Sequence, residues 1–167
     1  MLGWGEYTSV VEEIIVECKI STSPERCFDA ARNLDLHVRS MAHTNEIAVA
    51  GRTSGLIEMG EYVTWRARHF GVTQHLSSKI TAFDRPGYFQ DTMQRGAFKS
   101  FVHDHFFISD GPGTLMRDVL VFSAPFGTVG RIMEKLVLRR YLQKLLRDRA
   151  ATIREWAEQE RHARATG

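Results

Sequence analysis

The fold of this chain is decided by residues 72–122, which read VTQHLSSKITAFDRPGYFQDTMQRGAFKSFVHDHFFISDGPGTLMRDVLVF. β-Branched and aromatic residues concentrate here and just upstream in five strand-like runs, at 58–70, 72–83, 88–95, 98–108 and 114–122. Glycine and proline mark the turns between the runs, at Gly71, 84–87, Gly96 and 110–113. Because such short connections cannot hold a parallel crossover, the sequence predicts an antiparallel meander.

The pattern changes on both sides of this meander. Upstream we expect a strand at 8–20, a helix with Ser23 as N-cap and Pro24 at its first position, a short helix at 36–41 and a strand at 46–50. Downstream, residues 127–159 carry apolar side chains at helical spacing, which predicts one long amphipathic helix. The expected fold class is therefore α+β, with a curved antiparallel sheet of about seven strands wrapped on a long C-terminal helix. We expect one domain over residues 1–160 and a frayed tail at 161–167.

The amino-acid composition indicates which broad class of protein this chain belongs to. With 167 residues, 43% of them hydrophobic and 25% charged, the chain has the make-up of one ordinary globular domain. No apolar run approaches the roughly 20 residues of a spanning helix, so no integral membrane insertion is expected. Only two cysteines are present, Cys18 and Cys27, and residues 1–13 lack the pattern of a signal peptide. These features favour a cytoplasmic protein.

Positive charge is concentrated at the C-terminal end. Residues 126–167 hold 10 of the 22 Lys+Arg and 5 of the 20 Asp+Glu. An interaction module that binds a protein or a membrane surface is one interpretation, through Arg131, Lys135, Arg139, Arg140, Lys144 and Arg147. A solvated helix face is the favoured one, because acidic residues are interleaved with the basic ones. No nucleic-acid partner is expected.

Six short segments carry a resemblance to a known superfamily. In chain order they read SPERCF (23–28), WRARHFG (65–71), ITAFDRP (80–86), FVHDHFF (101–107), GTLMRD (113–118) and PFG (125–127). Over residues 8–156 the chain resembles the START-like superfamily of helix-grip folds, also called SRPBCC proteins, in its polyketide cyclase/dehydrase-like ligand-binding group. The resemblance implies a cavity between the sheet and the C-terminal helix. It implies no one function, because the superfamily includes aromatase/cyclases, lipid and sterol carriers, plant hormone receptors and coenzyme-Q-binding proteins.

Two histidines lie on one face of a predicted strand. His103 and His105 are two residues apart, the spacing that a metal site on a sheet would use. Further ligands would have to come from residues such as His69, His75 or Asp118. The favoured interpretation has no metal and no cofactor, with both histidines partly buried and hydrogen-bonded to Asp118 or to an arginine.

Asp118 stands among apolar residues of its strand. If it faces inward, burial raises its pKa unless a cation such as Arg68 or a protonated His103 pairs with it. One hypothesis makes His103 and Asp118 candidate catalytic residues, which orient a ligand's carbonyl or hydroxyl or act as acid and base in a cyclisation or dehydration. The favoured alternative is a structural ion pair between strands.

Alternation along the strands predicts the cavity wall. Trp65 shares a face with Glu61, Val63, Ala67 and His69, which leaves Arg68 outside and conflicts with its use as a partner of Asp118. On the next strand Val72, Leu76 and Ile80 form the inward set, and Tyr141 is a further candidate from the helix. The expected ligand-binding residues are Trp65, Leu76, Ile80, Phe101, His103, Met116, Asp118, Ile132, Met133 and Leu136.

The sequence thus favours a protein that binds a small lipophilic molecule as a carrier, sensor or store, as a monomer or homodimer. The alternatives are an enzyme of the aromatase/cyclase or dehydratase kind and the interaction module described above. Because no phosphate-binding loop, nucleophile elbow or Cys-x-x-Cys motif is present, we expect neither nucleotide hydrolysis nor covalent catalysis.

Overall fold

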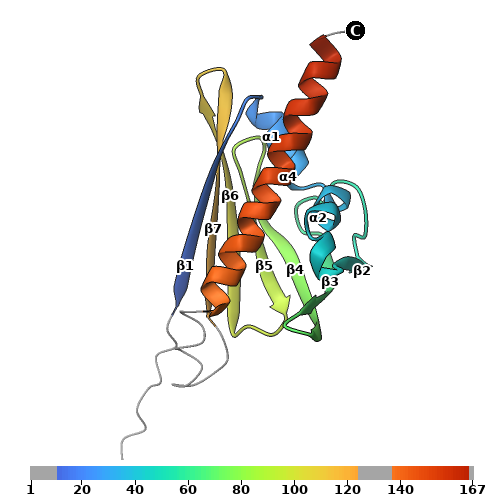
Figure 1. Ribbon diagram of the computed structural model, residues 1–167. Coiled ribbons are helices and arrows are strands. Elements are labelled where there is room, and N and C mark those ends of the chain that lie inside the picture. Colours follow the sequence, from blue (N-terminus) through green and yellow to red (C-terminus); the bar gives the residue numbers. More distant parts are fainter. Residues whose placement is uncertain (1–10, 124–136, 166–167) are drawn as a thin grey trace, which may run out of the picture.

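A single antiparallel sheet forms the framework of the protein (Figure 1). The computed structural model describes residues 11–123 and 137–165, with side chains of the last helix up to residue 159. The seven strands are β1 (Glu12–Ile20), β2 (Ile47–Gly51), β3 (Tyr62–His69), β4 (Val72–Asp84), β5 (Tyr88–Arg95), β6 (Ser100–Asp110) and β7 (Gly113–Ser123). Their order is β1-β7-β6-β5-β4-β3-β2, so the predicted meander from β3 to β7 is confirmed. The first strand joins this sheet beside the last one, with Ile20 opposite Thr114.

Helices cover one face of the sheet. They are α1 (Pro24–Ala31), α2 (Leu34–Ser40), the short 3-10 helix η1 (Ala42–Thr44) and α4 (Arg139–Ala165). Pro24 opens α1 after Ser23, as the sequence predicts, although the Ser23 side chain makes no capping hydrogen bond. The α2 helix has a true side-chain cap, because Asn33 accepts hydrogen bonds from the backbone N–H groups of Asp35 and Leu36. Figure 1 shows α4 crossing the sheet, and it contacts β1, α1 and α2.

Several expected boundaries need correction. The helix expected at 36–41 begins two residues earlier, at Leu34, because Asn33 caps it. The strand expected from residue 58 begins at Tyr62, since Gly60 adopts φ 80° in a turn. The start expected for the long helix, at residue 127, lies outside the described residues, and the predicted tail at 161–167 stays a prediction. No helix in the described part of the chain is both long and apolar enough to cross a membrane.

The core is centred on Phe28 of α1. Its ring is fully buried and lies edge-on to three strand aromatics, Phe83, Phe89 and Phe107, at centroid distances of 5.0–5.4 Å. Removal of a ring this well packed costs about 3 to 5 kcal/mol. The contact fixes α1 against the sheet beside β5 and β6. These two strands supply most of the polar side chains of the site described next.

Candidate functional site

An apolar cavity of about 400 Å³ lies between the sheet and α4. Its apolar wall comes from the sheet, α1–α2 and α4, and includes Leu34, Val63, Trp65, Leu76, Ile80, Phe89, Phe101, Leu120, Leu142, Leu145 and Leu146. Phe70 and Ala97 also line it and are exposed, which marks where the cavity meets the solvent. Near Phe70 the Tyr141 hydroxyl lies 2.7 Å from His69 Nδ1, so a hydrogen bond ties α4 to β3.

The structure places the expected ligand-binding residues in three groups. Trp65, Leu76, Ile80, Phe101 and His103 line the cavity, and so does Tyr141. Met116 and Asp118 are buried but do not line it, although Leu120 of the same strand does. Ile132, Met133 and Leu136 lie outside the described residues. Val72, expected in the inward set with Leu76 and Ile80, does not line the cavity: it is 59% exposed at the start of β4, next to the turn at Gly71.

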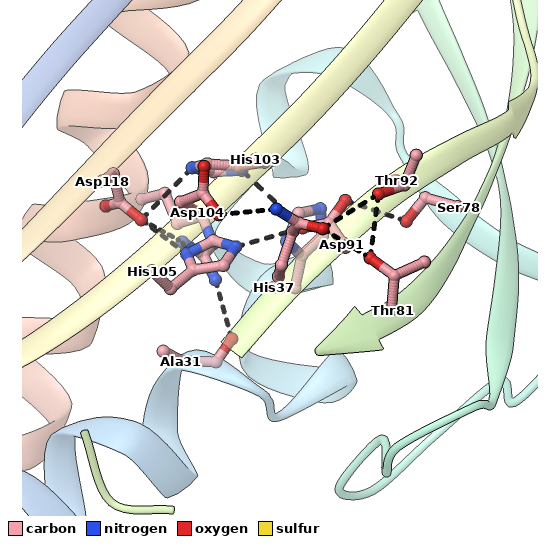
Figure 2. A network of polar contacts seen from close by, with 12 residues as sticks. Ala31, His37, Ser78, Thr81, Asp91, Thr92, His103, Asp104, His105 and Asp118 are labelled. Atoms are coloured by element: carbon pink, nitrogen blue, oxygen red, sulfur yellow. Dashed lines mark hydrogen bonds and ion pairs between the residues drawn. The ribbon is translucent and has the colours of Figure 1, made fainter. Parts of the chain in front are cut away.

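A polar cluster interrupts the apolar wall (Figure 2). It joins Asp91 of β5, His103 and His105 of β6, and Asp118 of β7. His105 is held at both ring nitrogens, with Nδ1 2.6 Å from Asp118 Oδ1 and Nε2 3.0 Å from Asp91 Oδ2. His103 lies beside it, with Nε2 3.2 Å from Asp118 Oδ1 and Nδ1 3.8 Å from Asp91 Oδ2. The two histidine rings are in contact, at a centroid distance of 3.8 Å.

Strand register brings these residues together. Asp91 is directly opposite His103, and His105 is directly opposite Asp118. Since side chains alternate across a sheet, all four project from the same face, toward α4. The sequence prediction that both histidines share a face and that Asp118 points inward is therefore correct in geometry. A binding or catalytic role of these residues remains a prediction.

Arg149 closes the cluster from the helix side. Its guanidinium donates to the Ala31 carbonyl at 2.7 Å and lies 3.4 Å from Asp118 Oδ1. Only 5% of this arginine is exposed, so it brings a positive charge into the core. On the far side of the cluster, Ser78 Oγ donates to Asp91 Oδ1 at 3.0 Å. Each carboxylate thus has a partner outside the histidine pair.

The pKa values of the cluster follow from the same contacts. Burial alone would raise the pKa of both carboxyl groups, but the contacts with His103 and His105 outweigh it. The pKa of Asp91 is lowered to about 2, and that of Asp118 is held well below its usual range with the help of Arg149. Burial and the adjacent His105 lower the pKa of His103. Nε2 of His103 and Oδ2 of Asp118 have no hydrogen-bond partner among the described residues.

Some expected members of the cluster are elsewhere. Arg68 is not the partner of Asp118, because it points away from the cavity and bonds the Gly71 carbonyl. His69 lies on the Tyr141 side of the cavity, and His75 is exposed on β4. Neither belongs to the group of potential metal ligands, which is Asp91, His103 and His105.

Sequence reasoning missed Asp91 and Arg149, although each carries a signal. Asp91 has the same parity as the buried Phe89 on its strand. Arg149 falls on the apolar stripe of its helix, at the spacing set by Leu145, Leu146 and Ile153. A charged residue in an apolar stripe is a candidate for a buried partner.

The sheet, its order and the long helix across it define a START-like helix-grip fold of the SRPBCC type. The structure is similar to that of a START superfamily protein from Mycobacterium smegmatis, with TM-score 0.67, 12% identity, and coverage of 88% of this chain and 97% of that one. It is also similar to a Thalictrum norcoclaurine synthase point mutant in complex with a transition-state analogue, with TM-score 0.69, 11% identity, and coverage of 92% of this chain and 98% of that one. A protein of Thermus thermophilus has TM-score 0.68 and 19% identity, and the match covers 85% of this chain and 97% of that one. At these identities the similarity is one of fold.

At the level of sequence, no protein-family model and no curated protein matches the chain.

Proposed function

We propose that this protein binds a small, largely apolar molecule in the cavity, with a polar group of that molecule directed at Asp91, His103 and His105. The observation that carries the proposal is one cavity with an apolar wall and one polar cluster. Its volume of about 400 Å³ lies within the roughly 300 to 1,000 Å³ of small-molecule sites. The apolar wall would supply affinity, and the cluster would supply orientation.

His103 is the side chain best suited to meet the polar group. It lines the cavity, is 7% exposed, and its Nε2 makes no hydrogen bond to the described residues. A buried polar atom without a partner costs about 1 to 3 kcal/mol. A ligand carbonyl, hydroxyl or carboxylate that bonds His103 would recover part of this cost, which gives the site a preference for molecules with one polar end.

The similar structures support this proposal through their fold. One of them, the norcoclaurine synthase mutant, holds a transition-state analogue, so a helix-grip fold can hold an organic molecule. We also propose that residues 1–160 form one ligand-binding domain. A cytoplasmic location and a monomeric or homodimeric state remain predictions.

A ligand survey tests the proposal. Native mass spectrometry of the purified protein, followed by denaturing extraction, would show a co-purified molecule at near one per chain. For an empty protein, a panel of lipids, sterols, quinones and polyketides should contain a compound that raises the melting temperature. At 100 times its Kd such a compound adds about 2.7 kcal/mol, which corresponds to roughly 5 to 10 °C for a domain of this size.

A pair of substitutions on β4 locates the binding. Leu76 lines the cavity, whereas Lys79 is exposed on the opposite face of the strand. Leu76→Trp fills part of the cavity and should abolish the thermal shift, while Lys79→Trp adds the same indole outside and should preserve it. A shift lost equally in both variants, or no compound bound by the unmodified chain, would refute the proposal.

An acid–base enzyme of the cyclase or dehydratase class is the second candidate. It is favoured by the carboxylate–histidine contacts at the cavity wall, because a histidine paired with a buried carboxylate can move a proton. Product formation from a bound polyketide-like substrate, lost in His103→Phe, would support it. Binding without turnover would contradict the enzyme and support the ligand-binding protein proposed first.

A further inference from the structure

We propose that Asp91, His103 and His105 bind a divalent first-row transition-metal ion such as Zn²⁺, with Asp118 as the residue that positions both histidines. This site goes beyond the proposed ligand binding and does not depend on it. The three residues are the one group of potential metal ligands in the described part of the chain. Imidazole nitrogen together with one carboxylate is a donor set that zinc and ferrous sites use.

The spacing of the donor atoms suits such an ion. Two ligands of a tetrahedral ion with bonds of about 2.1 Å are about 3.4 Å apart. Asp91 Oδ2 lies 3.0 Å from His105 Nε2 and 3.8 Å from His103 Nδ1, and all three atoms lie within 4.8 Å of one another. The three residues therefore lie close enough together to share one ion after small side-chain adjustments.

The other polar atom of each ligand also has a neighbour: His105 and Asp91 make a hydrogen bond there, and His103 makes a close contact without one. Asp118 Oδ1 accepts from His105 Nδ1 at 2.6 Å, which directs Nε2 toward the ion. The same oxygen lies 3.2 Å from His103 Nε2, which leaves Nδ1 for the ion. Ser78 donates to Asp91 Oδ1, so Oδ2 is the oxygen that faces the two histidines. A carboxylate behind a histidine and a donor behind a carboxylate are the supports that metal ligands have in proteins.

The charge of the cluster indicates what the ion would bind. Asp91, Asp118 and the Arg149 guanidinium together carry one net negative charge, so a divalent ion would bring the buried charge to +1. An anionic group bound to the ion would restore neutrality.

The cavity offers the position for that group. Asp91, His103 and His105 all line it, so an ion with three protein ligands would keep its remaining coordination site toward the cavity. Three protein ligands with one open position is the arrangement of catalytic rather than structural zinc sites. The ligand class that fits is an apolar molecule with a carboxylate, enolate or similar anionic end.

Metal binding can be measured on the full chain without any organic ligand. The protein, treated with chelator and then dialysed against Zn²⁺, should hold one ion per chain by elemental analysis, with a Kd in the micromolar range or below. Co²⁺ should give the visible absorption of a four- or five-coordinate site. His103→Ala should weaken Zn²⁺ binding at least about 100-fold, and Asp118→Asn about 10- to 100-fold.

Two controls keep the result decisive. His75→Ala removes an exposed histidine of β4 and should leave the affinity unchanged. If the cluster variants do not fold, imidazole ¹⁵N spectra of the unmodified chain replace them, and Zn²⁺ should shift the signals of two histidines only. Zn²⁺ bound no more tightly than millimolar, or binding that survives His103→Ala or shifts histidines other than these two, would overturn the proposal.

Discussion

The two faces of β5 and β6 each carry a polar network built around a carboxylate, in very different surroundings. The inner network faces α4 and consists of Asp91, His103, His105, Asp118 and Arg149. The outer network faces away from the cavity and consists of Tyr88, Gln90 and Asp104. In the outer one, Asp104 Oδ1 accepts from Tyr88 Oη at 2.6 Å and from Gln90 Nε2 at 2.8 Å. The carboxylates of Asp91 on β5 and Asp104 on β6 thus each accept two hydrogen bonds.

Burial is what separates the two networks. Asp104 and its partners are half-buried, so water can replace a lost hydrogen bond. Asp118 is fully buried and Arg149 nearly so, so a lost partner there leaves a charge with no solvent. Short hydrogen bonds alone therefore do not measure how much a network contributes to stability. Substitutions in the two networks should differ accordingly, with the greatest losses in the inner one.

Arg149→Met should have the largest effect on stability. It removes the buried cation beside Asp118 and the hydrogen bond that joins α4 to the Ala31 carbonyl. Breaking a buried pair in this way costs about 3 to 5 kcal/mol, which urea unfolding would measure. The double variant Arg149→Met/Asp118→Leu should lose less than the sum of the two single changes. Strict additivity would contradict the coupling of the two charges.

Asp118→Asn should cost somewhat less, about 2 to 3 kcal/mol, because the amide keeps one acceptor for His105. The same variant distinguishes two roles of Asp118, measured by unfolding and by ligand binding. Lost binding with intact stability would count against a purely structural ion pair. Lost stability with intact binding would count against a role in the site.

Asp104→Asn should cost about 1 kcal/mol or less, since it replaces one acceptor on a half-buried face. Urea unfolding of this variant beside Asp118→Asn gives a matched pair on neighbouring strands. A loss as large as that of Asp118→Asn would show that burial is not what separates the two networks.

The Tyr88 hydroxyl should leave stability unchanged near neutral pH and affect it only in alkaline solution. Burial, followed by the hydrogen bond to Asp104, raises the pKa of Tyr88 to about 12. The unfolded chain loses this proton near its ordinary pKa, about 10, while the folded chain keeps it, so stability should fall as pH rises from there toward 12. NMR of the Tyr88 ring, assigned with Tyr88→Phe, would follow the titration. Asp104→Asn should lower the Tyr88 pKa, and an unchanged value would contradict the assigned cause.

Local sequence predicted the strands well and the site only in part. Turn residues such as Gly71 and those at 110–113 fix the hairpins by their backbone preferences, and alternation places His103 and His105 on one face. Alternation also favoured Val63 and Trp65 as the inward set of β3 without excluding the other face, and both residues are buried. These features depend on neighbours in the chain.

The two site residues that sequence reasoning missed, Asp91 and Arg149, are placed by contacts with residues far away in the chain. Asp91 faces His103 because of the β5–β6 register, and Arg149 reaches Asp118 because of how α4 crosses the sheet. Neither relation is encoded within a window of about ten residues. Arg68 is a different case, because alternation along its own strand already placed it outside, as the structure shows.

The pairing of β1 with β7 also has a consequence for the order of events during synthesis. The β1 strand can pair with β7 only after Thr114, the partner of Ile20, has been synthesised about a hundred residues later. At roughly 5 to 20 residues per second this interval is on the order of 5 to 20 s. Arg149 emerges later still, so the inner network cannot be complete before most of α4 has been synthesised. A chain that ended before Arg149 would contain the sequence of every strand and leave Asp118 without its arginine.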